Sequence, residues 1–184
     1  MAAESDLHHG FLYLDRFTCV QEKEGLLGRD SPYFLVFVGH AGPGDGCDVI
    51  RVRHPDWEGA IATGDTRVTD VWVHHAVHGT STVLVALLEQ DWQCDIDDAV
   101  LDGLRREMSA HWRHCRETAS RPDDRADKAA VLFERSLRRV MRNDHLIGLA
   151  PLPITTDHGA LPVLTLGGED ARYRTVFRVR ALVP

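Results

Sequence analysis

A stretch of helical period interrupts an otherwise β-type sequence, and this interruption constrains the fold more than any other feature. Between about residues 97 and 142, apolar residues recur every three or four positions in two successive segments, which predicts two amphipathic helices. The segment 120–124, Ser-Arg-Pro-Asp-Asp, separates them and carries the proline that breaks the helical pattern. We therefore expect an α-helical hairpin, with Asp97 or Asp98 capping its first turn.

Short β-type runs lie on both sides of this predicted hairpin. Gly, Asp and Pro separate the runs, which occupy residues 11–20, 32–38, 48–53, 68–77, 81–88, 146–154 and 173–182. The run at 81–88 is continuously apolar, as expected of a strand buried on both faces. Regular short strands with such turns predict an all-β antiparallel sandwich, and the hairpin is then an insertion in it.

Length and charge restrict the classes of protein that fit. The 184 residues suit one domain, with the sandwich at 7–96 and 144–183 and the helical insertion at 97–143. The formal net charge of -7 disfavours a nucleic-acid binder that works by neutralising phosphates. The sequence shows neither an apolar leader nor a run of transmembrane length, and its four cysteines are widely spaced. These features predict a cytoplasmic protein with reduced thiols.

Several carboxylates lie where predicted strands begin or end. Asp30 precedes the run at 32–38, Glu89 and Asp91 follow the run at 81–88, and Asp144 opens the strand after the insertion. Loops collect at the two ends of a sandwich, so these side chains can meet there. Clustered carboxylates repel one another unless a cation compensates them, and calcium accepts carboxylate and carbonyl oxygens from loops. The four residues are therefore a candidate calcium site, with solvated loop acids as the alternative.

The order of these segments resembles that of a C2 domain. Residues 28–36, Gly-Arg-Asp-Ser-Pro-Tyr-Phe-Leu-Val, resemble the signature in which a glycine and a Ser-Asp pair precede Pro-Tyr, with Asp and Ser exchanged here. Residues 85–92, Val-Ala-Leu-Leu-Glu-Gln-Asp-Trp, resemble the strand that enters the Asp-x-Asp calcium loop, with Glu89 replacing the first Asp and Asp91 matching the second. Residues 143–148, Asn-Asp-His-Leu-Ile-Gly, resemble the segment that closes this loop, with one additional residue.

This C2 resemblance covers the sandwich segments and places the helical hairpin inside the third calcium loop. The sequence departs from the C2 pattern at the first loop, where the family's calcium-binding Asp has only Glu22 and Glu24 as nearby candidates. The resemblance implies a non-catalytic module that binds an anionic phospholipid membrane or a protein partner with calcium. Such a module would be cytoplasmic and peripheral at the membrane.

Two groups of residues are candidates for contact with that target. Trp92 lies in the acidic loop, where an exposed ring could insert at a membrane interface. Four arginines at spacings of three and four share one face at the end of the second helix: Arg135, Arg138, Arg139 and Arg142. They could instead pair with Asp123, Asp124 or Glu134, and the helix C-terminus itself favours cations.

A second class of function stays open, in which the protein is a calcium-independent structural or protein-interaction subunit that uses the hairpin as its interface. An enzyme is the third class and the least favoured. No H-E-x-x-H or G-x-S-x-G motif occurs, and no acid, base and nucleophile converge by a recognisable spacing. Although the chain has 11 His, adjacent strand residues such as His74 and His75 point to opposite faces, which disfavours a shared metal.

Overall fold

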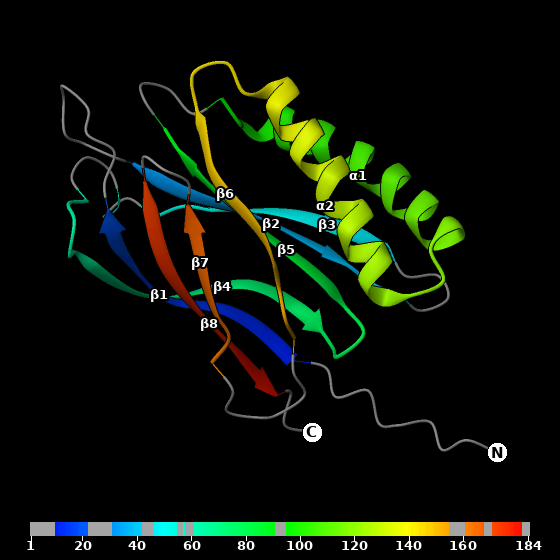
Figure 1. Ribbon diagram of the computed structural model, residues 1–184, viewed down its shortest axis with the longest axis horizontal. Helices are drawn as coiled ribbons and strands as arrows, with labels where there is room; N and C mark the ends of the chain where they lie inside the picture. Colours follow the sequence, from blue (N-terminus) through cyan, green and yellow to red (C-terminus); the bar gives the residue numbers. More distant parts are fainter. Residues whose placement is uncertain are drawn as a thin grey trace.

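A computed structural model of the protein describes residues 10–21, 31–41, 46–54, 57, 61–90, 95–154, 161–167 and 171–181. The described chain forms two sheets and a helical pair (Figure 1). In chain order the elements are β1 Gly10–Gln21, β2 Pro32–Gly39, β3 Cys47–Val52, β4 Thr66–Val77, β5 Thr82–Glu89, α1 Asp98–Thr118, α2 Pro122–Val140, β6 His145–Leu152, β7 Val163–Gly167 and β8 Arg172–Ala181.

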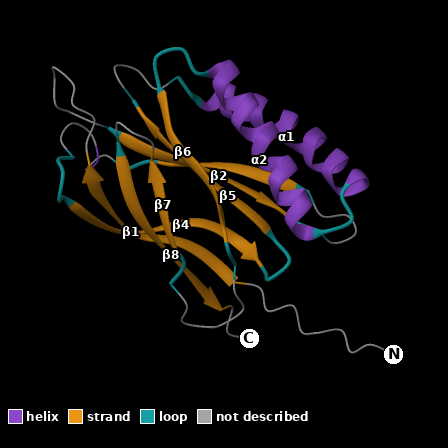
Figure 2. Ribbon diagram, in the orientation of Figure 1, coloured by secondary structure: helices purple, strands orange, loops and turns teal. Residues whose placement is uncertain are grey.

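The sheets have the strand orders β4-β1-β8-β7 and β3-β2-β5-β6, and every strand pairing is antiparallel. The chain leaves β5, forms α1 and α2, and returns to β6, the neighbour of β5 in the same sheet. Both helices lie along the outer face of that sheet (Figure 2). The predicted antiparallel sandwich with an inserted hairpin is therefore confirmed, and the arrangement is consistent with a C2-like sandwich.

One strand was not predicted. Residues Val163–Gly167 form β7, in which Val163 and Thr165 are exposed while Leu164 and Leu166 are buried. This alternation is visible in the sequence, but it extends over only five residues. The strand is held by its antiparallel pairing with β8.

Two apolar layers lie on either side of β2 and β5. Alternate side chains of these strands, such as Phe34 and Val85, pack between the sheets. The others, such as Phe37 and Leu84, pack beneath the helices, where Phe133 of α2 joins them. Every residue of β2 is buried, and nearly every residue of β5. The apolar stretch 83–88 within the predicted run therefore follows from burial on both faces.

Polar contacts cap the start of α1 and join α1 to α2. Asp97 is the N-cap of α1 and accepts a hydrogen bond from the Val100 backbone N–H at 2.8 Å, as predicted. Glu107 of α1 accepts hydrogen bonds from Ser136 at 2.8 Å and from Arg139, both on α2. Burial opposes ionisation of Glu107, but these bonds and one from His111 outweigh it and lower the pKa of the carboxyl. The helices are thus tied by charge as well as by apolar packing.

Among the described residues, Cys19, Cys47 and Cys115 form no disulfide bond, and burial raises the pKa of the Cys47 and Cys115 thiols. In the described part of the chain, neither helix has an apolar stretch long enough to cross a bilayer.

The close approach of α1 to the end of β2 generates a test of this packing. A Cβ atom at Gly39 would lie 2.7 Å from the ring of Trp112, which is buried, packs against Phe37 and donates a hydrogen bond to the His40 carbonyl. Gly39→Ala should therefore lower the free energy of unfolding by about 1–3 kcal/mol. Gly103→Ala is the matched control, because nothing lies within 4 Å of that Cβ position and alanine favours a helix interior.

Urea unfolding of both variants checks this contact. The Gly103→Ala variant should gain up to about 1 kcal/mol in unfolding free energy. Equal stability of the Gly39→Ala variant and the unaltered protein would contradict the packing of Trp112 against Gly39.

Candidate functional site

Strand register brings the acidic strand ends together at one end of the sheet β3-β2-β5-β6. Pro32 at the start of β2 pairs with Glu89 at the end of β5, and Glu89 also pairs with His145 at the start of β6. Neighbouring strands lie about 5 Å apart. The segments that carry Asp30, Glu89 and Asp144 in the sequence therefore enter or leave the sheet side by side, as expected of loops at one end of a sandwich.

Asp144 is buried at the point where the inserted hairpin rejoins the sheet. Its Oδ2 accepts a hydrogen bond from the Tyr33 hydroxyl and one from the Asp95 backbone N–H at 3.0 Å. Tyr33 belongs to the layer under the helices, so this contact links β2 to both ends of the insertion. Asp144 thus has a structural role that the sequence did not indicate.

Asp95, at the beginning of the insertion, binds the backbone at the end of the insertion. Its Oδ2 accepts hydrogen bonds from three successive backbone N–H groups, those of Arg142, Asn143 and Asp144, the last at 2.9 Å. Burial opposes ionisation of Asp95, but the bonds from the three backbone groups and the Asn143 side chain outweigh it and lower the pKa of the carboxyl. The two ends of the helical insertion are thereby tied together by Asp95 and Asp144.

Glu89, the other described member of the predicted calcium set, is also buried. Alternation along β5 turns Glu89 to the side of Leu87, which packs between the sheets, whereas Tyr33, the partner of Asp144, faces the helices. Within the residues that the structure describes, no group of three or more His, Cys, Asp or Glu side chains could hold a metal ion. Asp30 and Asp91 lie outside the described residues, so the complete set of four stays a prediction.

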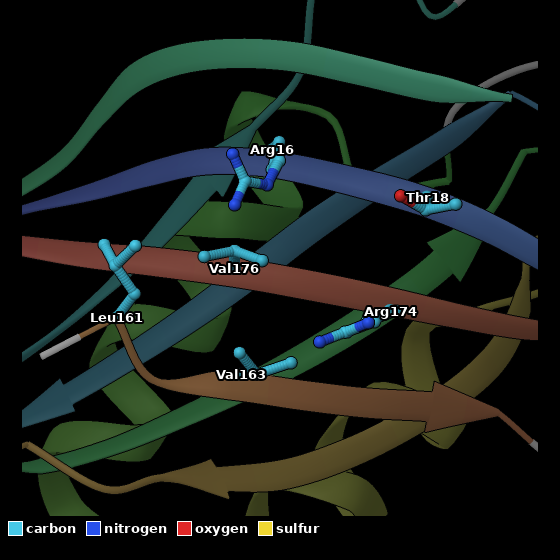
Figure 3. A pocket seen from close by; sticks show the side chains of 6 residues that line it. All are labelled: Arg16, Thr18, Leu161, Val163, Arg174 and Val176. Carbon is cyan, nitrogen blue, oxygen red and sulfur yellow. The ribbon is translucent and has the colours of Figure 1, made fainter.

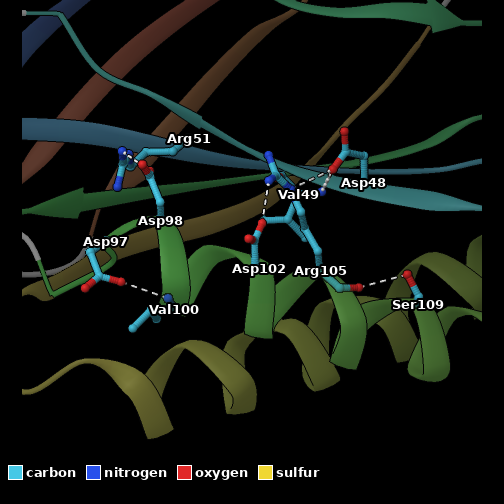
Figure 4. Close-up of polar contacts among 9 residues, drawn as sticks. All are labelled: Asp48, Val49, Arg51, Asp97, Asp98, Val100, Asp102, Arg105 and Ser109. Carbon is cyan, nitrogen blue, oxygen red and sulfur yellow. Dashed lines mark hydrogen bonds and ion pairs between the residues drawn. The ribbon is translucent and has the colours of Figure 1, made fainter.

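Acids along α1 and β3 are neutralised by contacts between these two elements (Figure 4). Asp98 forms an ion pair with Arg51 of β3 at 2.8 Å. Arg105 of α1 contacts Asp48 of β3 at 3.1 Å and Asp102 of its own helix at 2.9 Å. With Asp97 capping α1, these carboxylates attach the hairpin to the edge of the sheet, which leaves little of their charge for a cation.

Arg135, Arg138 and Arg139 lie on α2, whereas Arg142 lies two residues beyond its end at Val140, so the predicted arginine face does not continue on the helix to Arg142. All four arginines are exposed. Arg138 forms an ion pair with Glu134 at 2.7 Å, one of the pairings expected from the sequence. Arg139 contacts Glu107 across the hairpin, which sequence spacing within α2 did not indicate. The side chains of Arg135 and Arg142 form no ion pair with the described carboxylates, and Trp92 lies outside the described residues. Half of the predicted arginine face is therefore already paired.

No family model matches the chain, and no curated protein matches it. Among solved structures, the chain is similar to the C2A domain of plant extended synaptotagmin 1, with a TM-score of 0.44 and 7% sequence identity. That similarity covers 98% of this chain and 100% of the other.

The hydrogen bonds that Asp95 accepts from residues 142–144 lead to a prediction on how stability depends on pH. The ordinary pKa of this carboxyl is 3.8, and its folded pKa is lower. Its ionisation therefore contributes stability that is fully present above about pH 4 and is lost as the pH falls through the folded pKa. Asp95→Asn should lower the unfolding free energy at neutral pH by about 1–3 kcal/mol and flatten its dependence on acid.

Asp127→Asn removes one exposed carboxylate from α2 and serves as the matched control. Thermal unfolding between neutral pH and pH 3 should show the full acid-dependent loss in this control and a smaller one in the Asp95→Asn variant. Parallel curves for both variants would contradict the structural role of Asp95.

Proposed function

We propose that the protein is a non-catalytic binding module that docks to an anionic phospholipid membrane or to a protein partner. The observation that carries this proposal is the pairing of Pro32, Glu89 and His145, which aligns three segments that resemble C2 calcium-loop segments at one end of one sheet. A C2-like sandwich displays its binding loops at such an end. The protein would then act at the periphery of a membrane.

In this proposal the acidic end binds calcium through Asp30, Glu89, Asp91 and Asp144. A carboxylate offers about four lone-pair positions, so Asp144 can accept the bonds from Tyr33 and Asp95 and still contact a cation. Trp92 and the arginines at and just beyond the end of α2 would then contact the target; these arginines are Arg135, Arg138, Arg139 and Arg142. Bound calcium would reduce the local negative charge and allow an anionic surface to approach.

The competing proposal is a calcium-independent protein-interaction subunit that uses the helical hairpin as its interface. The apolar stripes of α1 and α2 are buried on the sheet with Leu104, Trp112, Phe133 and Leu137 in the contact. A partner would therefore meet the outer, polar face of the hairpin. Deletion of the hairpin would expose the layer beneath it, so substitutions on the outer face are the suitable test of this alternative.

Calcium titration tests the metal proposal. Calorimetry should detect heat of binding, and the melting temperature should rise with calcium concentration, because a ligand that binds only the folded state stabilises it by mass action. At 100 times the dissociation constant the gain is about 2.7 kcal/mol. Asp91→Asn should abolish both signals, whereas Asp127→Asn on exposed α2 should retain them. Absence of heat and of a melting shift at millimolar calcium would refute calcium binding.

A further inference from the structure

The two sheets of the sandwich differ in what covers their outer faces. The helical hairpin covers the sheet β3-β2-β5-β6, and no described element covers the outer face of the sheet β4-β1-β8-β7 (Figure 2). Most of the exposed large apolar side chains in the described chain lie on this second sheet or beside it. They are Val68 at 79% exposure, Trp72, Val20, Leu161 and Val163.

The same face carries arginines in regular alternation. Along β8, Tyr173, Thr175 and Phe177 are buried, and the side chains between and beyond them point outward. Those outward positions include Arg172, Arg174, Arg178 and Arg180, and β1 adds the exposed Arg16. A face of positive charge on a chain with a net charge of -7 requires an explanation of its own.

Two aspartates neutralise one half of this face. Asp70 lies 2.6 Å from Arg178 and 3.2 Å from Arg180, and Asp15 lies 2.9 Å from Arg178. Arg180 also lies over the ring of Tyr13, 4.6 Å from its centre. This half is therefore internally compensated and gains little from an anionic partner.

The arginines of the other half of this face have less compensation from carboxylates. Among the described carboxylates, Arg16 pairs with Asp15 alone, at 3.5 Å, and Asp15 is shared with Arg178. Arg174 forms no ion pair with a described carboxylate. Arg16 pairs in register with Val176, and Thr18 pairs with Arg174, so the two arginines are diagonal neighbours on adjacent strands. Together with Leu161 and Val163, these residues line a pocket of about 200 Å³ (Figure 3).

The chemistry of this pocket fits a phosphate group joined to an apolar body. Two guanidinium groups and the Thr18 hydroxyl can donate hydrogen bonds to phosphate oxygens. Val163, Val176 and Leu161 provide an apolar lining beside those donors (Figure 3). The exposed apolar side chains extend beyond the pocket from Val68 on β4 to Val163 on β7, which is broader than a single phosphate requires.

We propose that the outer face of the sheet β4-β1-β8-β7 is a docking surface for an anionic phospholipid bilayer. Arg16 and Arg174 contact lipid phosphates, and Val68, Val163 and Leu161 enter the interface between head groups and acyl chains. The proposal rests on the membrane-binding function proposed above and adds to it a surface that needs no calcium. This surface is distinct from the arginine face of α2.

Vesicle co-sedimentation in a calcium chelator tests this surface. The vesicles contain either phosphatidylcholine alone or equal parts of phosphatidylcholine and phosphatidylserine. The unaltered protein should pellet with the anionic vesicles only. Because one basic residue near an anionic surface contributes a factor of about five in partitioning, Arg16→Gln with Arg174→Gln should lower the partition coefficient about 30-fold.

Two further double variants separate this surface from general charge effects. Arg106→Gln with Arg113→Gln removes the same charge from exposed positions on α1 and should leave pelleting within about twofold of the unaltered protein. Val68→Thr with Val163→Thr preserves shape and strand preference and should weaken vesicle binding severalfold. Circular dichroism and melting temperature establish that each variant is folded.

The outcomes distinguish failure of this proposal from failure of the proposed function. If the unaltered protein pellets neither with calcium nor with chelator, membrane binding itself is refuted. If pelleting survives Arg16→Gln with Arg174→Gln but is lost in Arg135→Gln with Arg142→Gln, the α2 face binds the membrane and the sheet surface is refuted. If calorimetry detects inorganic phosphate binding that depends on Arg16 and Arg174 but vesicles do not bind, the pocket takes a free anion and the bilayer proposal is overturned.

Discussion

Burial of β2 and β5 on both faces is the constraint on which the rest of the structure depends. A strand such as Pro32–Gly39, with every residue buried, needs an apolar layer above and below it. The other sheet supplies one layer and the helical hairpin supplies the second. The hairpin is therefore part of the folded core despite its position as an insertion. Because it covers one sheet, the outer face left open for a partner belongs to the other.

Asp95 and Asp144 show that acidic residues at this end of the sheet have structural roles. An insertion must begin and end at neighbouring strands, and here β5 and β6 are neighbours. The backbone N–H groups after α2 need acceptors, and Asp95 supplies one carboxylate to three of them. Asp144 accepts bonds from Tyr33 and Asp95 in return. A cation at this end would thus bind beside a network that is already stable without it.

Local periodicity made much of the fold predictable. The continuous apolar run of β5, the helical spacing of Leu101, Leu104 and Met108, and the cap at Asp97 depend on residues close in sequence. The short β7 lacked enough length to be recognised by pattern and depends on pairing with β8. The role of Asp95 could not be predicted, since its partners are 47 to 49 residues away.

The pocket on the sheet β4-β1-β8-β7 could not be predicted either, because its residues are distant in sequence. Arg16 and Val176 become neighbours only through the register of β1 with β8. The alternation of arginines along β8 was evident, but which of them are compensated by a carboxylate depends in part on Asp70. The positive φ of Asp70, 42°, lies in a backbone region that Asp adopts more readily than most residues.

The net charge of -7 is a sum over regions of different character. Many acids are paired locally, as Asp98 is with Arg51 and Asp70 is with Arg178 and Arg180. The half-face around Arg16 and Arg174 is compensated only by the shared Asp15, 3.5 Å from Arg16, among the described carboxylates, and exposed apolar side chains surround it. Screening acts over roughly 8 Å at physiological salt, so an approaching surface responds to this local charge more than to the sum over the chain. An acidic protein can for this reason present a basic surface to an anionic bilayer, with the remaining acids directed elsewhere.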